Sequence, residues 1–169
     1  WLRSQGCPWN QQAVYGAAAA MGHFHILEWI QARHLLRDCD RVCRGAAVGG
    51  HLDALQWARA NGYDWDSGVC SWAARGGHFE VLKWARCNGC PWNADPCRAA
   101  SSKGHLYILQ WARAQHCPWH GSTCAAAAAG GHLDVLKWAR RNGCTWTERT
   151  GSGAADAGRL DMLQWAREE

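Results

Sequence analysis

Long apolar runs are missing from this sequence of 169 residues. The runs of small apolar residues at Ala17–Ala20 and Ala125–Ala129 fall far short of the roughly 20 residues that span a bilayer. No apolar segment follows the charged start of the chain, so we expect neither a signal peptide nor a membrane partner. Strong charge of one sign is also missing, because the formal net charge is only +4. Acidic partners are therefore permitted but not required.

Alternation of apolar and polar residues, the signature of β-strands, is missing as well, and we expect an all-α protein. No acid pair, no nucleophile beside a base and no phosphate-binding glycine loop stands out. We therefore expect no enzyme activity, no catalytic residues and no cofactor.

What the chain has instead is one motif repeated along its length. The dipeptide Gly-His begins at Gly22, Gly50, Gly77, Gly104 and Gly131, and Gly158-Arg159 is a sixth, degenerate copy. Tryptophan follows each of these glycines after seven residues, at Trp29, Trp57, Trp84, Trp111, Trp138 and Trp165, and Trp1 occupies the same position in a partial copy. A second tryptophan column comprises Trp9, Trp65, Trp92, Trp119 and Trp146. A period of this size predicts a solenoid of stacked repeats.

The stretch Gly77–Lys103 predicts how one unit folds. Apolar residues at helical spacing over 79–86 predict an amphipathic helix that ends at Asn88-Gly89, with glycine in the left-handed conformation. An extended linker follows, and Asp95-Pro96 predicts a second helix with Asp95 as its N-cap. That helix runs to Gly104, which turns the chain into the next unit.

The copies predict one array over residues 1–169, with about six stacked helix pairs. Its units open at Gly22, Gly50, Gly77, Gly104, Gly131 and Gly158, and partial units at both ends indicate a segment of a longer array. Three departures are expected: a different linker at His34–Asp40, a strained turn at His116 where glycine is replaced, and a loose glycine-rich helix near 153–157 after a linker over 147–152.

The pattern at Ala127–Lys137, with two alanines before Gly-His-Leu-Asp-Val-Leu-Lys, resembles the ankyrin repeat. The resemblance implies antiparallel helix pairs and a concave partner-binding face. The usual ankyrin period is 33 residues, whereas this one is 27, and the difference falls where ankyrin repeats carry a β-hairpin finger. We therefore expect fingers that are shortened or absent. With its Trp-Ala-Arg and Gly-Cys-Pro-Trp signatures, the chain resembles short ankyrin-like repeats of protists and giant DNA viruses.

Eight of the ten cysteines follow the repeat. One column comprises Cys7, Cys90, Cys117 and Cys144, with Tyr63 in the remaining copy, and another comprises Cys43, Cys70, Cys97 and Cys124, with Gly151. Positions that accept tyrosine or glycine are not obligate disulfide partners, so we interpret them as small buried groups. This favours an intracellular, cytoplasmic location, which is the host cell if a virus encodes the chain. A zinc site at Cys87 and Cys90 with Cys97 and His105 is a weaker alternative, and we expect no metal.

Both tryptophan columns are expected to pack between repeats, although base stacking or partner binding is an alternative. A basic column comprises Arg3, Arg59, Arg86, Arg113, Arg140 and Arg167. It could follow a phosphate backbone, but each arginine stem could also cover a tryptophan, and acidic residues on the same helices weaken the field. Nucleic-acid binding through this column is therefore our alternative function, and we do not favour it.

The function we expect is a monomeric, non-catalytic scaffold that binds a protein partner. Two positions in each alanine-rich helix change residue type from unit to unit, as a specificity surface does. They predict a site that comprises Arg44, Val48, Ser71, Arg75, Arg98, Ser102, Lys103, Ser152 and Asp156. Drift on an unused surface is an equally good explanation of this variation. Part of the functional argument rests on the family resemblance alone.

Overall fold

A computed structural model describes residues 10–32 and 41–168, and in these residues it contains twelve short helices and no strand. The helices are α1 (Gln11–Ala20), α2 (Phe24–Ala32), α3 (Arg41–Gly49), α4 (Leu52–Ala60), α5 (Ser67–Gly76), α6 (Phe79–Cys87), α7 (Asp95–Ser102), α8 (Leu106–Ala114), α9 (Gly121–Gly130), α10 (Leu133–Arg141), α11 (Glu148–Asp156) and α12 (Leu160–Glu168). The all-α prediction is confirmed. The predicted linker at His34–Asp40 and the columns' first members, Trp1, Arg3, Cys7 and Trp9, lie outside the described residues.

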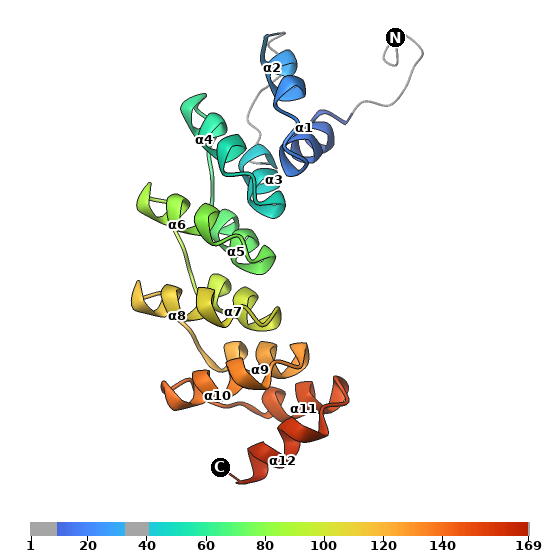
Figure 1. Cartoon of the computed structure of the whole chain (residues 1–169), viewed down its shortest axis with the longest axis vertical. Helices are drawn as coiled ribbons and strands as arrows, with labels where there is room; N and C mark the ends of the chain where they lie inside the picture. Colours follow the sequence, from blue (N-terminus) through green and yellow to red (C-terminus); the bar gives the residue numbers. More distant parts are fainter. Residues whose placement is uncertain (1–9, 33–40, 169) are drawn as a thin grey trace.

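The helices stack as pairs in two parallel rows (Figure 1). The odd-numbered helices, here called the inner helices, lie on the inner side of a gently curved array, and the even-numbered outer helices lie on its outer side. Each inner helix packs against the next inner helix and against the outer helix that follows it in the chain. Neighbouring outer helices make few contacts with one another, so the outer row is splayed and the array curves.

Small residues allow the inner row to pack closely. Ala46, Ala73, Ala100 and Ala127 are fully buried there. A β-carbon added to Gly45 of α3 would lie 2.3 Å from the carbonyl oxygen of Gly16 in α1, so only glycine permits this approach. Buried leucine and valine side chains of the outer helices, such as Leu82 and Val81, complete one continuous core. The inner row is therefore a closely packed platform for side chains that point away from the core.

Glycines end most helices as the sequence predicts. Gly62, Gly89 and Gly143 follow outer helices with φ between 81° and 84°, a conformation that side chains with a β-carbon disfavour. His116 occupies the same place after α8 with φ 60°, which confirms the predicted strained turn. Gly104 turns the chain between α7 and α8 with φ 75°.

Two predicted helix starts are wrong. Ala94 is the N-cap of α7, and Asp95 is its first helical residue, because the carboxylate bonds to the side chains of Asn93 and Arg98 instead of capping. The predicted linker at 147–152 is mostly helix: Thr147 forms a capping box with Thr150, and α11 begins at Glu148. Side-chain hydrogen bonds between near neighbours accompany both starts, a pairing at Asp95 and a capping box at Thr147, and spacing alone does not reveal them.

No helix in residues 10–32 and 41–168 has both the length and the apolar character needed to cross a membrane. Each described helix has eight to ten residues.

Candidate interaction surface on the inner helices

All nine predicted site residues lie on the inner row, on α3, α5, α7 and α11 or directly after them. Arg75, Arg98, Lys103, Ser152 and Asp156 are exposed, and Val48 is 44% exposed. Arg44, Ser71 and Ser102 are half-buried. The structure brings the residues of α3, α5 and α7 into one neighbourhood, but α9 separates them from Ser152 and Asp156 on α11. Ser152 and Asp156 therefore do not belong to the same local surface.

Two of the predicted cationic residues, Arg44 and Arg98, form ion pairs. Arg44 Nη2 lies 3.2 Å from Oδ2 of Asp66, the N-cap of α5. Arg98 Nη2 lies 3.1 Å from Oδ1 of Asp95 within α7. Hydrogen bonds from Arg98 and from Asn93 lower the pKa of Asp95, which keeps this carboxylate ionised. Because a carboxylate offsets the charge of each, Arg44 and Arg98 present little net positive charge to a partner.

The two serines nearest this surface bond to their own helices. Ser71 Oγ donates to the carbonyl oxygen of Ser67 at 3.1 Å, and Ser102 Oγ donates to that of Ala99 at 2.8 Å. Neither hydroxyl has a free proton to offer a ligand, so the cations and apolar groups between them dominate the chemistry of the surface.

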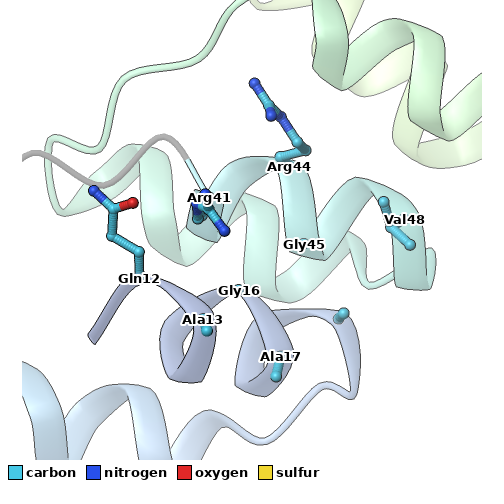
Figure 2. A pocket seen from close by; sticks show the side chains of 9 residues that line it. Gln12, Ala13, Gly16, Ala17, Arg41, Arg44, Gly45 and Val48 are labelled. Carbon is cyan, nitrogen blue, oxygen red and sulfur yellow. The ribbon is translucent and has the colours of Figure 1, made fainter. Parts of the chain in front are cut away.

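A groove of about 500 Å³ lies between α1 and α3 (Figure 2). Gly16 and Gly45 face each other at its floor, and Gln12, Ala13 and Ala17 line it from α1. Arg41, Arg44 and Val48 line it from α3, and Figure 2 shows that the Arg44 side chain extends away from α1. The α1 side of this groove is formed mostly by alanines and a glycine.

A second groove, of about 250 Å³, crosses three inner helices: it is lined by Val48 of α3, by Trp72, Arg75 and Gly76 of α5, and by Lys103 at the end of α7. Trp72 is 40% exposed, and the guanidinium carbon of Arg75 lies 6.0 Å from the centre of its ring. Sequence reasoning missed Trp72. The signal was available, because Trp72 is the one tryptophan of thirteen that belongs to neither column.

The arginine column is built into the outer side of the array. Its guanidiniums lie over the linker tryptophans at 4.4–5.2 Å, in the pairs Arg59–Trp65, Arg86–Trp92, Arg113–Trp119 and Arg140–Trp146. Arg86 Nη1 also donates to the carbonyl oxygen of Cys90 at 3.3 Å, and Arg113 makes the equivalent bond to Cys117. These arginines hold the linkers, as the stem-covering interpretation predicts.

Apart from Trp29, which is 47% exposed, the described tryptophans of the two columns pack against the core but are only half-buried, so the prediction of a core position holds in part. A linker tryptophan meets the helix tryptophan of the next unit, with ring centres 5.4–5.9 Å apart, in the pairs Trp65–Trp84, Trp92–Trp111, Trp119–Trp138 and Trp146–Trp165. The splayed outer row leaves one side of each pair open to solvent.

The two cysteine columns meet inside the array, in the pairs Cys70–Cys90, Cys97–Cys117 and Cys124–Cys144. Cys90 donates its thiol proton to the carbonyl oxygen of Asp66 at 3.4 Å. The hydrogen bond to Cys90, together with burial, raises the pKa of Cys70, so this thiol stays protonated. All described cysteines are free thiols, and seven of them are buried.

Cys87 and Cys90, the pair considered for zinc, point into different environments. Cys87 is exposed, whereas Cys90 is buried against Cys70. Across residues 10–32 and 41–168 no three potential metal ligands come together. The histidines of the Gly-His turns pack between units, since Nε2 of His78 bonds to the carbonyl oxygen of Val48 at 3.1 Å.

No family model matches this sequence, and no curated protein matches it either. The functional argument therefore depends on the surface of the array itself.

Proposed function

We propose that the chain is a non-catalytic scaffold that binds a protein partner through its inner helices. One observation carries the proposal: the array repeats its core and its linkers from unit to unit, but the exposed positions of the inner helices differ at each step. The position of Arg44 is taken by serine, arginine, alanine and serine in later units, and that of Val48 by arginine, serine, alanine and aspartate. Residues freed from packing are those that a binding surface can adapt.

We further infer that the array is a short ankyrin-like repeat, without the hairpin fingers of longer ankyrin units. Three features support this: antiparallel helix pairs, Gly-His turns within the pairs, and an inner row of small residues on the curved side. The stretches between an outer helix and the next inner helix contain no strand in the described residues. Without fingers, the inner helices would supply most of the partner-binding surface.

The test is affinity capture from an extract of the source cells, with the immobilised chain as bait. The bait variant Arg75→Glu/Arg98→Glu reverses two charges on the inner helices. The matched control, Lys83→Glu/Arg141→Glu, makes the same change in net charge at two exposed residues of the outer helices. We expect partners that bind the wild type and the control but not the inner variant, as judged by quantitative mass spectrometry.

Retention of every captured protein by the inner variant would show that this face is not the binding site. The alternative, nucleic-acid binding through the arginine column, is tested by a gel shift with single- and double-stranded oligonucleotides at about 50 mM salt. A salt-dependent shift that Arg86→Ala and Arg113→Ala weaken would favour the alternative. The contacts of these arginines with tryptophans and linker carbonyls are the reason we do not expect this result.

A further inference from the structure

Two residues differ in kind from their counterparts in the other units, and they lie in the same groove. Every described counterpart of Trp72 is small, namely Ala17, Gly45, Ala99, Ala126 and Gly153. Lys103 is the only charged residue at its position in the described units, where the counterparts are Met21, Gly49, Gly76, Gly130 and Ala157. Architecture does not require the large side chains, because the sibling units stack without them. Yet Trp72 and Lys103, which are 31 positions apart in the sequence, line one groove together with Val48, Arg75 and Gly76.

The groove combines an exposed apolar surface with positive charge. Val48 is 44% exposed and Trp72 is 40% exposed, so the groove lining presents both an indole and an isopropyl group to solvent. Gly76 adds no side chain between them, and a β-carbon there would lie 2.4 Å from the ring of His78.

Arg75 and Lys103 supply the charge. Neither makes an ion pair with any residue in the described part of the chain, whereas Arg44 and Arg98 nearby are paired with Asp66 and Asp95. The guanidinium of Arg75 lies beside the indole of Trp72. From this position it can bond to an acidic group and still keep its contact with the indole ring. The groove therefore combines two cations that form no ion pair with the apolar surface of Trp72 and Val48.

We propose that this groove binds an acidic peptide segment of a partner protein, with one large apolar side chain of the segment seated on Trp72 and Val48. Carboxylates flanking that side chain pair with Arg75 and Lys103. Two unpaired cations suit one or two carboxylates, whereas a nucleic-acid strand needs a longer row of phosphate contacts. This inference rests on the proposed function and adds the chemistry of the partner to it.

The experiment uses fluorescein-labelled short peptides as probes. One set has an Asp/Glu frame around a central leucine, phenylalanine or alanine, and the other has the same central residues in a Lys/Arg frame. Binding is followed by fluorescence anisotropy, and its location by chemical shifts of the ¹⁵N-labelled protein. Trp72→Phe assigns the indole N–H signal of Trp72. Since sibling units hold alanine and glycine at the two positions, Trp72→Ala and Lys103→Gly leave the stacking intact.

We expect acidic-frame peptides with central leucine or phenylalanine to bind and to shift the signals of Trp72, Arg75 and Lys103. Trp72→Ala and Lys103→Gly should each weaken binding by about tenfold, because each removes one part of the contact. The control is Trp29→Ala, which removes a similarly exposed tryptophan from the outer row and should leave the affinity unchanged. Added salt should weaken the acidic peptides.

The proposal is wrong if acidic-frame peptides do not bind, if basic-frame peptides bind equally well, or if Trp29→Ala has the same effect as Trp72→Ala. It is also wrong if a single-stranded oligonucleotide, and no peptide, shifts the Trp72 signal. Each of these results leaves the capture experiment above unaffected. A partner lost only from the inner variant would then still support the scaffold function, with a ligand chemistry other than the acidic one.

Discussion

Ser101 places a hydroxyl group in the most closely packed row of the array. It lies on α7, has no exposed surface, and its Oγ has no hydrogen-bond partner. The equivalent residues of three sibling units are Ala47, Ala74 and Ala128, which are all fully buried as well. The array thus contains its own demonstration that alanine fits this position.

Replacing Ser101 with alanine should therefore stabilise the protein. A buried hydroxyl without a partner costs about 1–3 kcal/mol, and the substitution leaves no cavity larger than the lost oxygen atom. Alanine also has a higher helix propensity than serine, by a few tenths of a kcal/mol. We expect the free energy of unfolding to rise by at least about 1 kcal/mol. For a chain of this size that corresponds to an increase in melting temperature of about 2–4 °C.

The assay is urea unfolding followed by far-ultraviolet circular dichroism, with Ser102→Ala as the matched control. Ser102 is the next residue of α7, and its hydroxyl donates to the carbonyl oxygen of Ala99 at 2.8 Å. Both variants exchange serine for alanine in the same helix, so the difference between them compares an unpaired buried hydroxyl with a hydrogen-bonded, half-buried one. The control should change stability by less than about 0.5 kcal/mol.

Equal or lower stability of Ser101→Ala would refute this reasoning. It would mean that the hydroxyl has a partner in solution, and the carbonyl oxygen of Cys97, one turn earlier in the helix, is the candidate. A larger gain in Ser102→Ala than in Ser101→Ala would refute it equally.

Further outcomes follow from the same structure. His116→Gly should raise the free energy of unfolding by about 1 kcal/mol, because glycine adopts the left-handed turn at φ 60° without strain; chemical denaturation measures this. Arg86→Ala should lower it by about 1 kcal/mol, because the linker loses both its guanidinium stacking and a hydrogen bond, and Arg86→Lys should not restore it fully. Gly45→Ala should cost about 1–3 kcal/mol, because its β-carbon meets backbone of α1, and a thermal melt tests it. Site-resolved mass spectrometry after iodoacetamide should show fast labelling of exposed Cys87 and slow labelling of buried Cys70, whose pKa is raised.

Much of the fold could be predicted from local chemistry. The period, the glycine turns and the strained His116 follow from residues that act on their own backbone. Helix starts were harder to predict, because the Asp95 carboxylate can either cap α7 or pair with Arg98. Only the folded geometry decides between these two bonds. How deeply the tryptophans are buried could not be predicted from the sequence either, because it depends on how far the outer helices spread apart.

The candidate site shows the same division. The sequence by itself determined the helical repeat, the small inner positions and the fact that Trp72 and Lys103 are exceptions to their columns, because these are properties of single positions and their spacing. Only the tertiary structure decided that Val48, Trp72, Arg75 and Lys103 line one groove, and that Arg44 and Arg98 are neutralised beside it. The physical reason is that stacking places neighbouring inner helices in contact although they are about 27 residues apart in the chain. Contacts between units, unlike contacts within a helix, depend on how closely those helices approach.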